Sequence, residues 1–213
     1  MAGTRGIVID EHGVARCAWG ASAPEYPPYH DHEWGFPVDD DRRLFEKVCL
    51  EGFQAGLSWI LVLRRREHLR KVFANFEIDR LARFDARRVE RLLTDPGVIR
   101  HRGKIEAAIQ NARCARELVR EYGSLAAYFW SFEPPARERP KRVTWAWLKK
   151  HPHSPTSHAM SRDLRKRGWS FVGPTTMYAF MQAMGLVNDH VEGCVAGVAT
   201  EAARRSFVRP AKR

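Results

Sequence analysis

Two cysteines and two histidines near the ends of the chain form a set that could bind a metal ion. Cys17 and His30 lie in a stretch rich in proline, glycine and aromatic residues. His190 and Cys194 are four positions apart, so one helical turn would place both on the same face. Two thiolates and two imidazoles suit tetrahedral zinc. The pairs lack the tight spacing of a zinc finger, and His32 competes with His30; without a metal, each residue would be an ordinary buried or hydrogen-bonded side chain.

A basic turn at residues 98–105 could contact phosphate. It contains Arg100, Arg102, Gly103 and Lys104. Gly103 would let main-chain N–H groups approach a phosphate oxygen, and the N-terminus of the following helix adds a positive end. This pattern is typical of a helix–hairpin–helix that binds the DNA backbone independently of the base sequence. A plain helical turn with solvated basic side chains is the alternative.

A third group combines aromatic rings with one carboxylate. Glu51 follows the apolar run 48–50 and precedes a turn that contains glycine. A carboxylate among aromatic faces can accept hydrogen bonds from the amino group of a nucleobase, and the faces attract a cationic ring. Alternatively, the rings belong to the core and Glu51 is solvated. The aromatic members are Trp19, Tyr26, Tyr29, Trp34 and Trp59.

Helical periodicity would position these groups. The aspartates at 39–41 can cap one helix, and residues 85–93 form another. The clearest 3.6-residue period runs over 103–122, and Gly123 can end it. Further helices are predicted over residues 58–73, 125–132, 157–167 and 175–184. Residues 133–156 contain five prolines and many charges, which predicts a long surface connection. Because period-two alternation is scarce, the predicted fold class is all-α.

The composition favours a globular protein with a polyanionic partner. The 213 residues are 44% hydrophobic, enough for a core and too many for a disordered chain. The formal net charge is +11, which favours nucleic acid as the partner. The first residues lack the apolar segment of a secretory signal, and no apolar run is long enough to cross a membrane. We therefore expect a cytoplasmic protein with reduced cysteines and no membrane partner.

Four blocks of the sequence together resemble signatures of the 3-methyladenine DNA glycosylase I family. They are YHDHEWG at 29–35, CLEGFQAGLSW at 49–59, IRHRGKI at 99–105 and GLVNDHVEGC at 185–194. The blocks follow the family's order with similar gaps, and the resemblance spans nearly the whole chain, from Cys17 to Cys194. Four linked blocks are far more specific than any single motif. The first residues, the segment 133–156 and the tail after Cys194 do not match clearly.

The resemblance implies a helix–hairpin–helix fold with a structural zinc ion that joins the two chain ends. The implied zinc ligands are Cys17, His30, His190 and Cys194. The implied pocket for alkylated adenine consists of Trp19, Tyr26, Tyr29, Trp34, Glu51 and Trp59. Leu57 lies in the loop that the family brings to the gap left by a flipped base. With the basic turn, the expected DNA-binding residues are Leu57, Arg100, Arg102, Gly103 and Lys104.

The expected organisation is a flexible arm at 1–13, one compact glycosylase unit at 14–200 and a basic tail at 201–213. Within the unit, we expect a helix–hairpin–helix lobe at about 46–180. The zinc lobe would combine about 14–45 with 181–200.

On this resemblance we expect a monomeric, monofunctional DNA glycosylase of base excision repair that acts on double-stranded DNA carrying alkylated bases. The ring of 3-methyladenine is cationic and already a good leaving group. The enzyme therefore needs to flip the base, hold it and stabilise an oxocarbenium-like sugar. Glu51 is the expected catalytic residue, which would bind the adenine edge and balance its charge. Trp59 would stack on the ring, and Tyr29 would add a polar contact.

No aspartate follows the hairpin at the distance that related glycosylases use, and Glu121 is the nearest acid. Lys104 could act as a nucleophile, but phosphate contact is its expected role, so we expect hydrolysis without strand cleavage. Two rival classes are a non-catalytic zinc protein that binds DNA and a zinc hydrolase. A zinc hydrolase would need an open site with three protein ligands, whereas four ligands imply a closed structural site.

Overall fold

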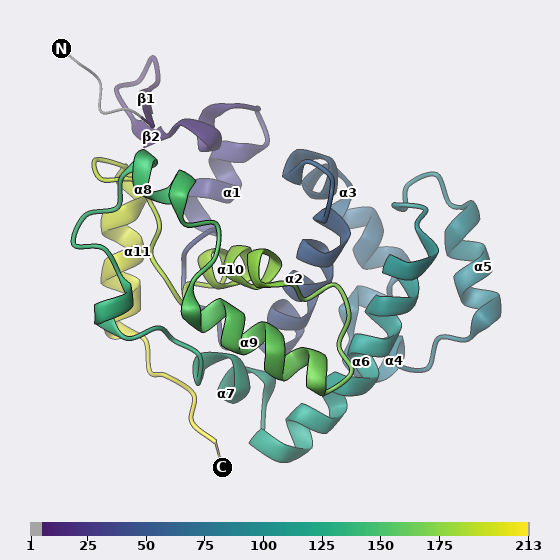
Figure 1. The fold of residues 1–213 in the computed structure, drawn as a ribbon. Helices are drawn as coiled ribbons and strands as arrows, with labels where there is room; N and C mark the ends of the chain where they lie inside the picture. Colours follow the sequence, from purple (N-terminus) through teal and green to yellow (C-terminus); the bar gives the residue numbers. More distant parts are fainter. Residues whose placement is uncertain (1–5, 213) are drawn as a thin grey trace.

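Helices make up most of residues 6–212, which are the residues that the computed structural model describes (Figure 1). The strands are β1 (Ile7–Ile9) and β2 (Ala15–Cys17), and the short 3₁₀ helices are η1 (Ala18–Ala21), η2 (Ala74–Phe76) and η3 (Ala136–Glu138). The α-helices are α1 (Tyr26–His32), α2 (Asp41–Gln54), α3 (Trp59–Val72), α4 (Ile78–Leu81), α5 (Ala86–Thr94), α6 (Arg102–Tyr122), α7 (Leu125–Trp130), α8 (Trp145–Lys150), α9 (Pro155–Lys166), α10 (Pro174–Ala183) and α11 (Val195–Ser206). None of the described helices is long and apolar enough to span a membrane.

Capping residues begin and end the helices close to the predicted positions. The Asp40 carboxylate accepts a hydrogen bond from the main-chain N–H of Arg43 at 2.7 Å and starts α2. Asp85 starts α5 in the same way. Gly123 adopts a φ of 87°, the left-handed conformation that ends α6 without steric cost. The predicted helices over 58–73, 85–93, 103–122, 125–132, 157–167 and 175–184 are confirmed as α3, α5, α6, α7, α9 and α10.

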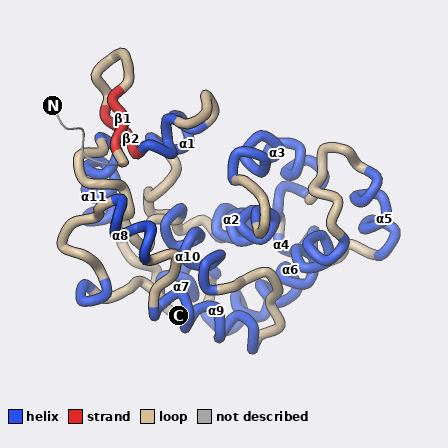
Figure 2. The backbone as a smooth tube through the Cα atoms, turned by 45° about the horizontal axis from the view of Figure 1, so that its top comes forward, coloured by secondary structure: helices blue, strands red, loops and turns tan. Residues whose placement is uncertain are grey.

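Helix α2 lies in the middle of the core, as Figure 2 shows, and contacts α3, α6, α7 and α10. Its buried side chains include Phe45 and Phe53, neither more than 1% exposed. Because α2 is surrounded on several sides, ten consecutive residues from Leu44 to Phe53 are buried, including three charged ones. Those three are Glu46, Lys47 and Glu51, so α2 brings charge into the interior.

The two ends of the described chain pack against each other. Helix α11 contacts both α1 and β2, which places the C-terminal segment beside the N-terminal one (Figures 1 and 2). Strands β1 and β2 pair antiparallel, with Ile7 opposite Cys17. This hairpin is the exception to the predicted all-α class. It also corrects the predicted flexible arm over residues 7–9, while residues 1–5 of that arm lie outside the described residues.

The predicted basic tail also differs from the structure in part. Helix α11 extends to Ser206, so the first residues of the predicted tail are helical. Arg204 and Arg209 both bind Glu133, at 2.7 and 2.9 Å, which ties the end of the chain to the segment after α7.

Candidate functional site

Cys17, His30, His190 and Cys194 converge on one buried point, with their four ligand atoms within 4.8 Å of one another. The Cys194 Sγ lies 3.4 Å from His190 Nδ1 and 3.5 Å from His30 Nε2. Metal–ligand bonds of about 2.0–2.3 Å in a tetrahedron place such atoms roughly 3.5 Å apart, so the set fits a metal ion. His32, the rival ligand, is exposed and stands outside the cluster.

Neighbouring groups fix the tautomers of both histidines. His30 Nδ1 lies 2.7 Å from Asp31 Oδ1, and a carboxylate only accepts, so Nδ1 carries the proton and Nε2 presents its lone pair to the cluster. His190 Nε2 donates to the carbonyl of Trp34 at 3.1 Å, which leaves Nδ1 facing the cluster. Arg16 in turn holds Asp31, with Nε 2.8 Å from Oδ2. Second contacts of this kind are typical of metal-binding histidines.

The two thiols of the cluster differ in acidity. The hydrogen bond from Cys17 is the main cause that lowers the pKa of the Cys194 thiol. The hydrogen bond to Cys194 and burial raise the pKa of Cys17. The cluster therefore holds one sulfur that ionises readily, and thiolate is the form that binds metals. Gly20 allows the close fit, because a Cβ there would lie 2.5 Å from His30 Cδ2.

An aromatic cavity of about 260 Å³ opens beside this cluster. It is lined by Trp19, Tyr29, Trp34, Glu51, Gln54, Trp59, Trp145, Leu148, Ala179 and Gln182. The Trp34 ring lies 4.8 Å from the His190 ring, so the cluster supports one wall of the cavity. The Tyr29 and Trp59 rings lie 5.4 Å apart and form another part of the wall.

The structure brings five of the six predicted pocket residues together at this cavity: Trp19, Tyr29, Trp34, Glu51 and Trp59. Tyr26 does not line it, and packs instead edge-on against Trp19 with ring centroids 5.6 Å apart. Trp145 and Leu148 were missed because they belong to α8, inside the segment predicted as a surface connection. The apolar pair in Trp145–Leu148 was the available signal.

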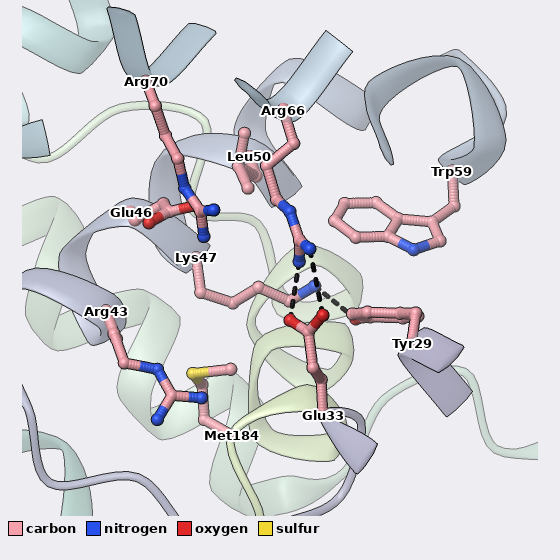
Figure 3. A pocket seen from close by; sticks show the side chains of 10 residues that line it. All are labelled: Tyr29, Glu33, Arg43, Glu46, Lys47, Leu50, Trp59, Arg66, Arg70 and Met184. Carbon is pink, nitrogen blue, oxygen red and sulfur yellow. Dashed lines mark hydrogen bonds and ion pairs between the residues drawn. The ribbon is translucent and has the colours of Figure 1, made fainter. Parts of the chain in front are cut away.

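Glu51 reaches the cavity from the last turns of α2 and is only 6% exposed. Lys47, one turn earlier, places its Nζ 3.0 Å from Glu51 Oε1. The same nitrogen donates to the Tyr29 hydroxyl at 2.6 Å and lies 3.6 Å from the centroid of the Trp59 ring. Figure 3 shows the Lys47 side chain running toward Tyr29 and Trp59. Sequence reasoning missed Lys47, although its i,i+4 spacing to Glu51 was a signal.

Burial shapes the acidity of these groups. Desolvation lowers the pKa of the Lys47 ammonium, while the nearby Glu51 carboxylate opposes that shift. Desolvation, followed by the charge of Glu51, raises the pKa of the Tyr29 hydroxyl well above its usual range. Tyr29 is therefore a neutral hydroxyl that can donate as well as accept. The Trp59 Nε1 is buried with no hydrogen-bond partner among residues 6–212, which leaves a donor for a ligand or a water molecule.

The predicted basic turn joins α5 to α6. Arg100 is exposed, and Arg102 is exposed and bound to Glu90, with Nη2 2.8 Å from Oε1. Gly103 lies in the first turn of α6 and is half-buried. These positions leave Arg100 and Arg102 accessible to a partner on the surface.

Lys104 is buried, so the prediction that it contacts phosphate on the surface is wrong. It is 7% exposed, and its Nζ donates to the main-chain carbonyls of Phe53 at 2.9 Å and Ala55 at 2.5 Å. These carbonyls end α2 and would otherwise lack partners. The ammonium therefore supports the loop that carries Leu57, which is 40% exposed.

Glu121, the acid nearest to the hairpin in sequence, does not reach the cavity. It sits at the far end of α6 and binds Arg167, with Oε2 2.5 Å from Nη1. The carboxylate that lines the cavity is that of Glu51.

Comparisons with known proteins converge on one family. The model of a family described as methyladenine glycosylase matches residues 19–197. The chain is 47% identical to DNA-3-methyladenine glycosylase 1 of Escherichia coli (strain K12) over 182 residues, which cover 85% of this chain and 96% of that protein. It is 42% identical to the DNA-3-methyladenine glycosylase of Haemophilus influenzae, over 85% of this chain and 97% of that protein.

Solved structures agree with this similarity. A crystal structure of 3-methyladenine DNA glycosylase I superposes with a TM-score of 0.78 at 48% identity, covering 84% of this chain and 98% of that one. A structure of 3-methyladenine DNA glycosylase I from Staphylococcus aureus, described as the structural basis of 3-methyladenine recognition, has a TM-score of 0.79 at 32% identity. It covers 85% of this chain and 96% of that one.

Proposed function

The chain belongs to the methyladenine glycosylase family, and from this premise we propose that it flips 3-methyladenine out of duplex DNA and hydrolyses its N-glycosidic bond. It is a DNA glycosylase, a hydrolase of N-glycosyl bonds.

The observation that carries the proposal is a single buried carboxylate in an aromatic cavity. Glu51 Oε1 is bound to Lys47, and its second oxygen can accept a hydrogen bond from the amino group of adenine. The rings of Trp19, Trp34 and Trp59 supply faces on which a flat, electron-poor base can stack. The cavity thus offers recognition for a purine with an amino group and a positive ring.

The reaction needs little proton transfer. As the bond between the sugar carbon and the base nitrogen breaks, its electron pair enters the cationic base, which leaves as a neutral molecule. Positive charge develops on the sugar, and water then adds to the sugar carbon and releases one proton to the solvent. Glu51, near the base, would hold it in place while the bond breaks.

The DNA contacts are proposed to come from two loops. The loop after α2 carries Leu57, whose exposed side chain would fill the gap left by the flipped nucleotide. Helices α5 and α6 would form the helix–hairpin–helix, with Arg100, Arg102 and the N-terminal N–H groups at Gly103 on phosphate. Lys104 would instead hold the first of these loops against the second.

The proposed metal is one structural zinc ion. The donor set of two sulfurs and two correctly oriented imidazole nitrogens fits it. Four protein ligands leave no open position for chemistry, so the ion would tie the N-terminal hairpin to α11. In this scheme residues 14–45 and 181–200 form the zinc lobe of one compact unit.

The contacts of Lys47 and Lys104 give no reason to expect that the protein cleaves the DNA strand. Such cleavage in related enzymes uses an amine that attacks the sugar carbon. Lys104 is engaged with two carbonyls, and Lys47 with a carboxylate and a hydroxyl.

The experiment that tests the proposal is chromatography of the bases that the purified protein releases from alkylated duplex DNA. Free 3-methyladenine is expected, and its absence would contradict the proposed function.

A further inference from the structure

Lys47 contacts three residues that we propose bind the base, namely Glu51, Tyr29 and Trp59. Its Nζ donates to Glu51 Oε1 at 3.0 Å and to the Tyr29 hydroxyl oxygen at 2.6 Å, and it lies 3.6 Å from the centroid of the Trp59 ring. The residue is 5% exposed and lines a smaller cavity of about 30 Å³ behind Tyr29 and Trp59 (Figure 3). It does not line the aromatic cavity itself, so any effect on the base passes through its three partners.

The first consequence concerns the direction of hydrogen bonds. An ammonium has donors and no acceptor, so the Tyr29 oxygen must accept from Lys47. The hydroxyl proton of Tyr29 then points away from Lys47 and is available as a donor. Because one nitrogen holds both Tyr29 and Glu51, a donor and an acceptor are kept close together. That pattern complements an adenine edge, on which an amino group lies beside a ring nitrogen.

The second consequence concerns charge. Two ion pairs and one further cation line the rest of the small cavity: Arg66 binds Glu33 at 2.6 Å, Arg70 binds Glu46 at 2.8 Å, and Arg43 forms no ion pair within residues 6–212. Lys47 is thus the partner of Glu51, and the pair carries no net charge. A lone carboxylate would hold the cationic base of the substrate more tightly than the neutral base that leaves. Such ground-state binding would slow the breaking of the bond.

We propose that Lys47 is a positioning residue that neutralises Glu51 and directs the Tyr29 proton, so that the pocket favours the departing neutral base over the bound cationic one. This inference rests on the proposed function. The step it affects is the heterolytic one: the bond to the sugar breaks, its electron pair goes to the base nitrogen, and the positive charge passes from the base to the sugar.

The test compares Lys47→Met with Arg43→Met in single-turnover excision of 3-methyladenine from alkylated duplex DNA. Arg43 lines the same small cavity but is not among the contacts of Glu51, Tyr29 or Trp59, so its variant controls for loss of a nearby charge. For Lys47→Met we expect the rate constant at saturating enzyme to fall about tenfold, because the Glu51 carboxylate without its partner stabilises the cationic base of the ground state more than the neutral base that leaves. The half-saturating enzyme concentration should fall or stay unchanged, and Arg43→Met should match the wild type.

Two outcomes overturn the proposal. One is an unchanged rate constant, or a change equal to that of Arg43→Met. The other is a lower rate constant together with a higher half-saturating concentration, which indicates general damage to the pocket. If the wild type itself releases no 3-methyladenine, the proposed function fails; if it does and the variants behave alike, only the role of Lys47 fails.

A second pair of variants decides the matter if Lys47→Met does not fold. Glu51→Gln leaves the Lys47 ammonium buried beside a cationic base, whereas Glu51→Gln combined with Lys47→Met removes both charges. The double variant should bind duplex DNA containing 3-methyladenine about tenfold more tightly than Glu51→Gln, measured against the same duplex without the lesion. Equal or weaker selective binding by the double variant contradicts the proposal.

Discussion

The Lys104 ammonium lies 2.9 Å from the main-chain carbonyl oxygen of Phe53, which joins the start of α6 to the end of α2. A second hydrogen bond, to Ala55, completes this connection. These two bonds give a residue of the basic turn partners inside the protein. The connection links the end of α2, which carries Glu51, and the Leu57 loop to the first turn of α6.

Lys104→Met should therefore lower stability rather than phosphate binding. Two buried carbonyls would lose a charged donor, at a cost of about 2 kcal/mol in the free energy of unfolding. We expect a lower melting temperature and slower excision, with the salt dependence of DNA binding unchanged. Thermal denaturation and binding titrations at several salt concentrations check this. A shallower salt dependence with normal stability would instead indicate that Lys104 contacts a DNA phosphate.

Arg100→Ala should show the opposite behaviour. Arg100 is exposed on the turn between α5 and α6, so its loss should leave stability nearly unchanged. Binding should weaken by a similar factor for all DNA sequences, and the slope of log affinity against log salt should fall by about one unit. A changed sequence preference at an unaltered slope would argue that Arg100 reads bases.

Much of this arrangement was predictable from local sequence patterns. Asp40, Asp85 and Gly123 mark helix ends through interactions within a few residues, and periodicity identifies the buried faces. The role of Lys104 was not predictable, because a lysine in a basic turn is normally solvated and its partners lie about fifty positions away in sequence. The same holds for Lys47, which is buried only because α2 is enclosed by other helices.

The remaining differences between the predicted and the observed structure arise from contacts between residues far apart in the sequence. Two of the four blocks contain half of the residues that line the cavity, but Trp145 and Leu148 line it from α8, whose position depends on tertiary packing. The β1–β2 hairpin is too short to give a clear alternating pattern. Tyr26 was grouped with the pocket by type, yet it packs behind Trp19.

The metal prediction concerns Cys194. The purified protein should contain one zinc ion per chain, and Cys194→Ala should lower both the zinc content and the melting temperature, because the ligands connect the two ends of the chain. Metal analysis and thermal denaturation measure both quantities. Cys114→Ala is the matched control, since Cys114 is buried but lies outside the cluster. Wild-type protein without metal would show that the ligand assignment is wrong.

Strand cleavage should be absent. With Lys47 and Lys104 both engaged, no covalent adduct should form when borohydride is added during reaction with alkylated DNA. Denaturing electrophoresis should show intact strands until the abasic sites are cleaved by alkali. A trapped adduct that disappears in Lys47→Met would identify that lysine as a nucleophile instead.

Selectivity for adenine is the prediction most closely tied to the chemistry of Glu51. A lesion with an amino group can donate to the free carboxylate oxygen, whereas guanine presents a carbonyl at the corresponding position. The carboxylate would then face another acceptor, and an unpaired buried group costs roughly 1–3 kcal/mol or more. The enzyme should therefore release 3-methyladenine in preference to 7-methylguanine. Unmodified adenine should stay in the DNA because its uncharged ring is a poorer leaving group. Chromatography of the bases freed from one alkylated DNA sample measures the first preference directly.

The Glu51→Gln variant tests directly whether the carboxylate is needed for excision. The amide keeps the size of the side chain but removes the charge, and it leaves the Lys47 ammonium without its carboxylate at 3.0 Å. Excision of 3-methyladenine should be lost, while binding of undamaged duplex through the α5–α6 turn stays nearly normal. Trp59→Ala should weaken capture of the free base, because a stacking face is removed. Equal release of 3-methyladenine and 7-methylguanine by the wild type would mean that the Glu51 carboxylate does not select the base, even though the enzyme remained a glycosylase.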